Sequence, residues 1–165
     1  MAFSIQNMLG ADLTAVYTPI SGLTGIDYPG PPFAAGTRTV GSDETEWIYC
    51  VAEEAITQYN AVGVDLSDGS AGKLTKAMAD AGRQIAFCQV SGVDSGEYFW
   101  AQTKGQGTIT LKNSCLPNVP LYTTASAGML DDTSASQTRV YGVRSTDTAT
   151  ASGAAKVCWI QGAVT

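Results

Sequence analysis

Few residues of this chain are suited to catalysis, because it contains no histidine. Histidine is the commonest general base and the commonest metal ligand, so its absence excludes Ser-His-Asp and Cys-His catalysis. The acid–base candidates that are left are Glu53, Glu54 and Glu97, each beside a run of residues that predicts a strand. A pair of carboxylates can hydrolyse a glycosidic bond. Carboxylates beside strands more often form a solvated face, and we therefore predict that the protein is not an enzyme.

Two further groups of residues could bind a metal. The loop Asp65-Leu-Ser-Asp-Gly69 is faintly similar to a calcium loop, but it departs from the D-x-D-x-D-G spacing. The four cysteines are Cys50, Cys88, Cys115 and Cys158, and no two of them form a C-x-x-C pair. We expect buried free thiols, and one or two disulfides or a metal site are the alternatives. The sequence predicts neither a cofactor nor a resident metal.

The composition limits the partners of the chain. Its net charge is −6 and it has no cluster of lysine or arginine, so binding to a phosphate backbone is not expected. No apolar stretch approaches the roughly 18 residues that a membrane span needs. The first seven residues lack the basic start and apolar run of a secretory signal. Length alone suits one domain.

The chain is organised around three predicted strands at its centre. They cover Gln84–Val90, Glu97–Lys104 and Thr108–Lys112. Short glycine-bearing connections separate them, and the second of these is Gly105-Gln106-Gly107. In the third strand Ile109 and Leu111 alternate with polar residues, which predicts one buried and one solvated face.

Further strand-like runs precede and follow this centre. They are Glu46–Ala52, Tyr59–Leu66, Lys73–Thr75, Cys115–Thr124, Ala127–Leu130, Arg139–Val143 and Lys156–Gln161. Residues 77–81 predict one helical turn, with Gly82 as its C-terminal cap. About nine short strands at turn-bounded spacing predict an all-β fold, a small β-sandwich or barrel over residues 41–165.

Large apolar residues within these runs form the predicted core. They are Trp47, Tyr49, Ile85, Phe87, Trp100, Ile109, Leu111 and Trp159. The alternative is that the aromatic residues Tyr98, Phe99, Trp100 and Trp159 line a sugar-binding platform. We favour the core because each lies within a continuous apolar run.

Residues 1–40 differ from the rest and form a predicted extended N-terminal arm. They carry four of the six prolines, and their apolar residues follow no period. One interpretation is an irregular strand and loop on the chain's own domain, and the other is an arm ordered by a partner subunit. On the second interpretation we expect the arm to contact the partner through its larger apolar residues, namely Phe3, Ile5, Met8, Leu9, Tyr17, Ile20, Tyr28 and Phe33.

Residues 45–165 carry a pattern of strands and turns that resembles a known family. Its parts are Val64–Gly69, Lys73-Leu-Thr, Gly82–Val90, Gly96-Glu-Tyr-Phe-Trp100-Ala-Gln-Thr-Lys-Gly105, Cys115-Leu-Pro-Asn-Val-Pro-Leu-Tyr-Thr-Thr124, Ala127–Leu130, Tyr141-Gly142 and Ala155–Ile160. The pattern resembles the capsid decoration (cement) proteins of tailed bacteriophages.

This resemblance implies a structural virion protein, assembled in the host cytoplasm and located on the outer capsid surface. It implies that the major capsid protein is the partner, and that the chain self-associates as a homotrimer. The alternative is a virion fibre or adhesin domain that binds host-surface carbohydrate, which exposed aromatic residues would favour. A secreted, disulfide-bonded enzyme is a further alternative, and four free thiols would exclude it.

Overall fold

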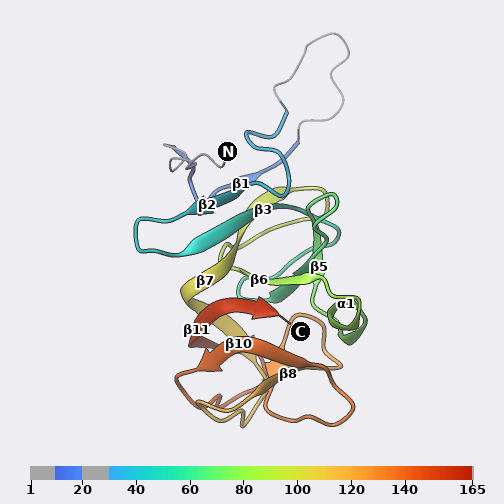
Figure 1. Cartoon of the computed structure of the whole chain (residues 1–165), viewed down its shortest axis with the longest axis vertical. Helices are drawn as coiled ribbons and strands as arrows, with labels where there is room; N and C mark the ends of the chain where they lie inside the picture. Colours follow the sequence, from blue (N-terminus) through green and yellow to red (C-terminus); the bar gives the residue numbers. More distant parts are fainter. Residues whose placement is uncertain (1–9, 20–29, 165) are drawn as a thin grey trace, which may run out of the picture.

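The computed structural model describes residues 10–19 and 30–164, which form strands with one short helix (Figure 1). In chain order the elements are β1 (Val16–Tyr17), β2 (Arg38–Val40), β3 (Glu46–Ala52), β4 (Ala61–Val64), β5 (Ser70–Lys73), α1 (Lys76–Asp80), β6 (Gln84–Cys88), β7 (Tyr98–Leu111), β8 (Leu121–Thr123), β9 (Leu130–Asp131), β10 (Arg139–Ser145) and β11 (Ala154–Val164). The predicted all-β fold is confirmed. The sheet has eleven strands in the described residues, where the sequence predicts about nine.

Five strands close into a first barrel. β3 pairs with β5, β5 with β4, β4 with β6 and β6 with β7, and β7 pairs back onto β3. Alternate residues of these strands point inward, so Ile48 and Cys50 of β3 meet Phe99 and Ala101 of β7 in a buried cluster. This explains why Glu46–Ala52 forms a strand with the bounds that its apolar pattern predicts.

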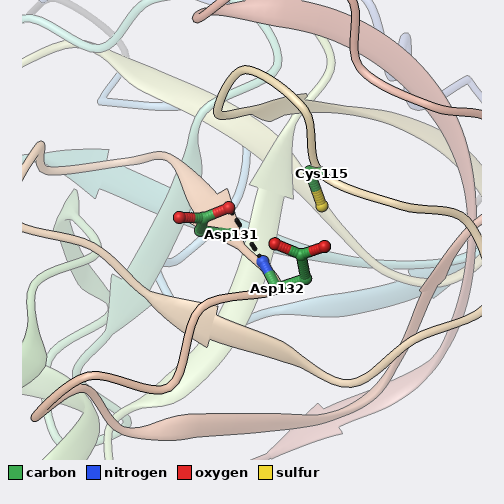
Figure 2. Close-up of side chains that lie close together, drawn as sticks. All are labelled: Cys115, Asp131 and Asp132. Carbon is green, nitrogen blue, oxygen red and sulfur yellow. Dashed lines mark hydrogen bonds between the residues drawn. The ribbon is translucent and has the colours of Figure 1, made fainter.

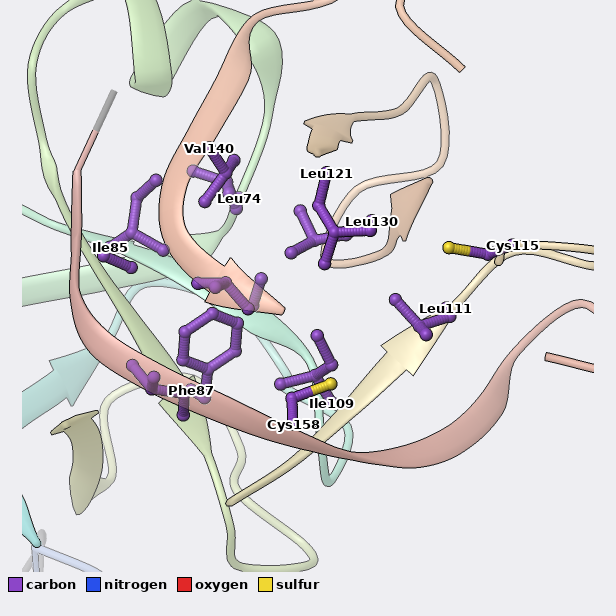
Figure 3. Packing of buried hydrophobic residues seen from close by; sticks show 14 of the residues in the cluster. Leu74, Ile85, Phe87, Ile109, Leu111, Cys115, Leu121, Leu130, Val140 and Cys158 are labelled. Carbon is purple, nitrogen blue, oxygen red and sulfur yellow. The ribbon is translucent and has the colours of Figure 1, made fainter. Parts of the chain in front are cut away.

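A second ring of five strands lies beside the first. β7 pairs with β11, β11 with β10, β10 with β8 and β8 with β9, and β9 returns to β7 through the single pair Leu130 and Leu111. Figure 3 shows its interior, where Phe87, Ile109 and Leu111 pack with side chains of the other strands. The predicted alternation of Ile109 and Leu111 toward the core is confirmed, since both are fully buried.

The strand β7 belongs to both barrels. Its first half pairs with β3 and its second half with β11, and Figure 1 shows it (yellow) passing from the first barrel into the second. The predicted break at Gly105-Gln106-Gly107 was wrong, because one strand of 14 residues runs through it. Gly105 has a φ of 101°, which glycine adopts without strain, and the strand bends there without ending.

The two barrels also share β6 as a common wall. Ala86 and Cys88 point into the first barrel, whereas Ile85 and Phe87 point into the core of the second. β6 is therefore apolar on both faces, as its sequence is. Next to it the Gln89 side chain donates to the carbonyl of Thr108 at 2.9 Å and accepts from the same residue's N–H at 3.2 Å. These bonds replace a strand partner for β7 where β6 has already ended.

The described parts of residues 1–40 pack on this body. β1 pairs with the start of β7, and β2 pairs with β3. Between them Gly36 donates to the carbonyl of Tyr49 at 2.7 Å, and Tyr49 donates to the carbonyl of Thr37 at 2.8 Å. Residues 36–40 therefore continue the sheet, and the predicted boundary between arm and domain at residue 40 falls within the β2–β3 hairpin.

The helix α1 contributes the buried Ala79 to the core of the second barrel, and Met78 packs against the same cluster. Thr75 caps its N-terminus by accepting from the Met78 N–H, and Gly82 follows its C-terminus with a φ of 73°. This is the helical turn and glycine cap that the sequence predicts. In the part of the chain that the structure describes, no helix is long and apolar enough to cross a membrane.

Candidate functional site

Two residues of the predicted partner-contact set are described, and both touch the chain's own strands. Tyr17 pairs with Tyr98, and their ring centres are 6.1 Å apart. Phe33 packs against Tyr49 at 5.5 Å and against Trp100 at 5.3 Å between ring centres. The other six lie outside the described residues, namely Phe3, Ile5, Met8, Leu9, Ile20 and Tyr28. Contact between this set and a partner stays a prediction.

Most of the predicted core residues are buried. Tyr49, Ile85, Phe87, Trp100, Ile109 and Leu111 are each at most 2% exposed. Trp47 is only half-buried, because it lies near the end of β3 and its indole N–H donates to the Thr45 hydroxyl at 2.6 Å.

The assignment of Trp159 to the core was wrong, since its side chain is 53% exposed. Its strand neighbours Cys158 and Ile160 point into the second barrel and are buried. Side chains alternate along a strand, so Trp159 and Gln161 must point outward. The polar Gln161, two positions from Trp159, is the sequence signal for this orientation.

Trp159 lies in a groove of about 390 Å³, which we call the Trp159 groove. Its wall is built from three segments that are distant in the sequence, residues 43–45, 104–106 and 159–161. The first is the turn between β2 and β3, the second is the bend of β7, and the third belongs to β11. The groove therefore lies where the two barrels meet.

Hydrogen bonds hold the turn at residues 43–45. The Asp43 carboxylate accepts from the Thr45 hydroxyl at 2.6 Å, and that hydroxyl accepts from Trp47. The Thr45 hydroxyl holds the pKa of Asp43 below its usual value, so this carboxylate is ionised at neutral pH. Gly41 donates to the carbonyl of Thr45 at 2.7 Å. The acidic wall of the groove is thus fixed before any ligand binds.

The bend of β7 is held from beneath by Gln102, whose side chain is buried. Its amide donates to the carbonyl of Lys104 at 3.1 Å and to that of Gln106 at 2.9 Å. Gly105 lies against Thr45, and a Cβ at this glycine would be 2.6 Å from the Thr45 methyl carbon. The Lys104 ammonium group pairs with Glu46 at 2.7 Å. The floor of the groove is therefore rigid, and the positive charge of Lys104 lies beside the negative charge of Glu46.

The three carboxylates that the sequence offers for glycoside hydrolysis have structural partners. Glu53 pairs with Arg83 at 3.2 Å, and Glu54 pairs with Lys73 at 3.7 Å. Glu97 accepts from the backbone N–H of Asp94 at 2.8 Å. Each carboxylate therefore stabilises a loop through an ion pair or a hydrogen bond. None of these contacts arranges two carboxylates around a common cavity.

The loop with faint calcium character is closed by its own side chains. Asp65 accepts from the Ser67 N–H at 2.9 Å and from the Ser67 hydroxyl at 2.7 Å, and these bonds lower its pKa. Asp68 accepts from the Ser70 N–H at 2.8 Å. These bonds are those of ordinary turns that use aspartate to bond the backbone two residues on.

All four cysteines are buried free thiols. Burial raises the pKa of Cys88 to about 11 and that of Cys158 to about 12, and it also raises the pKa of Cys50. Thiolates are the reactive form, so these groups are inert at neutral pH.

Cys115 lies with Asp131 and Asp132 in a cluster that could supply metal ligands (Figure 2). Burial, followed by the charges of Asp132 and Asp131, raises the pKa of Cys115 to about 11. Asp132 accepts from the Leu116 N–H at 3.0 Å, and Asp131 accepts from the Asp132 N–H at 2.9 Å. Through these hydrogen bonds the two carboxylates stabilise the loop that begins at Cys115.

Comparisons with known proteins add little to this description. No family model matches the chain, and a search of curated proteins finds no match. Among solved structures, the base of the head fibre gp8.5 of bacteriophage phi29 is similar with a TM-score of 0.45 and 12% sequence identity. The match covers 70% of this chain and 92% of that one. At this level the likeness supports no conclusion about function.

Proposed function

We propose that this chain is a structural virion protein that decorates the outer surface of a tailed-phage capsid. It binds the major capsid protein and bridges neighbouring subunits of the shell, and it acts as a homotrimer without catalysing a reaction. The observation that carries the proposal is the placement of the residues on which the family resemblance rests. They build the two joined barrels: Trp100 and Gly105 lie on β7, and Cys115 packs in the second core.

The architecture suits a protein that must resist load. Two cores joined through one continuous strand and one common wall form a stiff body, and contacts made at its two ends would be held at a fixed separation. In a bridge between capsid subunits, each 400 Å² of apolar contact would contribute on the order of 10 kcal/mol before ordering costs.

A decoration assay tests this proposal. Expanded shells that lack the protein are incubated with the purified chain, and electron microscopy then gives its location and copy number. We expect saturable decoration at threefold positions and an increased resistance of the shells to heat. Absence of binding, or a location restricted to one fibre or tail position, would contradict the proposal.

A truncation addresses the role of the arm. Deletion of residues 2–9 leaves every described contact in place, whereas deletion through residue 40 would remove β1, β2 and the cover that Phe33 gives Trp100. If the arm is the anchor, the short deletion lowers the occupancy on shells while the circular dichroism spectrum stays native. Wild-type occupancy would exclude residues 2–9 as the anchor.

A further inference from the structure

We propose that the Trp159 groove is a carbohydrate-binding site, with the indole of Trp159 as the platform for a sugar ring. The groove has the size of a small-ligand site, about 390 Å³, and pockets for such ligands commonly range from about 300 to 1,000 Å³. This inference does not rest on the proposed function, because the groove can bind a sugar whether or not the chain decorates a shell.

The exposure of Trp159 is the first observation. The side chain is 53% exposed, while Trp100, the large aromatic of β7, is 1% exposed. Tryptophan has a large apolar face and one N–H donor, so it is suited to surfaces that bind a ligand with an apolar face and polar edges. A pyranose has this character, because its ring C–H groups form an apolar face and its hydroxyl groups lie around the edge.

The polar residues of the groove are the second observation. Asp43 and Glu44 offer acceptors, Lys104 offers donors, and the amides of Gln106 and Gln161 offer both. Hydroxyl groups donate and accept, so a sugar can use this mixed set.

The charges of the groove argue against an acidic occupant. The carboxylates of Asp43 and Glu44 disfavour a phosphate or a second acidic group, and the ammonium of Lys104 is already paired with Glu46. A neutral, polyhydroxylated ligand meets no such repulsion.

The rigidity of the walls is the third observation. Gln102 fixes the bend of β7 through two carbonyl groups, and the Asp43–Thr45–Trp47 hydrogen bonds fix the facing turn. A site that is already in its binding geometry loses little entropy on binding, which matters most for weak ligands such as sugars.

Titration calorimetry with three neutral tetrasaccharides tests the proposal, with β-1,4-linked glucose, galactose and N-acetylglucosamine as the probes. We expect at least one to bind, and Trp159→Ala to weaken that binding at least about tenfold. Trp159→Phe keeps an aromatic face and should retain part of the affinity. Val157→Ala is the matched control, because Val157 lies on the same strand, is 38% exposed and does not line the groove.

Two results would overturn the proposal. One is that no tetrasaccharide binds at about 10 mM, and the other is that Trp159→Ala binds as the wild type does. Decoration of shells is measured on the same variants. Loss of decoration by Trp159→Ala, with no saccharide bound by the wild type, would identify the groove as a protein contact instead. Saccharide binding by a chain that decorates no shell would support the groove and contradict the capsid role.

Discussion

Phe33 covers the outer face of the first barrel, and its removal should destabilise the fold. Its ring lies 5.3 Å from that of Trp100 and 5.5 Å from that of Tyr49, measured between centres. Substitution of a fully buried phenylalanine by alanine costs about 3–5 kcal/mol. Phe33 is half-buried, so about half of that applies, and this figure already includes its two ring contacts. We expect Phe33→Ala to cost about 1.5–2.5 kcal/mol.

Urea unfolding followed by tryptophan fluorescence measures this cost. With a urea dependence of about 2 kcal/mol per molar, the midpoint should fall by about 1 M. In a Trp159→Phe background, acrylamide should also quench the folded variant more strongly, because Trp100 loses its cover. Tyr141→Ala is the control, since that ring is 49% exposed and its neighbour is the Arg139 guanidinium at 4.6 Å.

One outcome would refute the reasoning. If Phe33→Ala unfolds at the wild-type midpoint and its quenching is unchanged, then residues 30–37 do not cover the barrel in solution. The arm would then be available to a partner subunit, as the second interpretation of its sequence requires.

Four further predictions concern the cores and the bend of β7. Trp100→Ala should cost about 3–5 kcal/mol in urea unfolding, because the side chain is 1% exposed. The four thiols should not react with Ellman's reagent in the native protein at pH 8, and all four should react in urea. Burial raises the folded pKa of each thiol above its usual value of 9.0, to about 11 for Cys88 and about 12 for Cys158, so stability should be constant below pH 9 and fall as the pH rises through those values. Gly105→Ala should cost more than about 2 kcal/mol, from a positive φ and the clash with Thr45, and adding Thr45→Ser should recover part of the loss because it removes the clashing methyl group.

The local pattern of apolar and polar residues was sufficient to predict much of the fold. The run Glu46–Ala52 has the bounds of β3, and the alternation around Ile109 correctly gives its buried face. The break predicted at Gly105–Gly107 failed because glycines usually mark turns. What keeps the strand continuous is pairing with β11, more than forty positions away in the sequence, and no local signal reports it.

The candidate site was harder to predict than the fold. Its walls come from residues 43–45, 104–106 and 159–161, which only the closed sheet brings together. The run Lys156–Gln161 is apolar enough to suggest burial on both faces, and Trp159 was assigned to the core for this reason. Gln161 lies two positions from Trp159, so both side chains are on the same face of the strand, and the polar Gln161 indicates that this face is exposed to solvent.

The shared strand also determines how the molecule can move. Two cores joined by a linker behave as separate bodies that rotate about a hinge. Here the join is Lys104, whose backbone position pairs with Glu46 of β3 and with Gln161 of β11. Rotation of one barrel against the other would break strand pairs on both sides of that residue. The groove at the junction therefore keeps its width, and a ligand bound there would neither open nor close it.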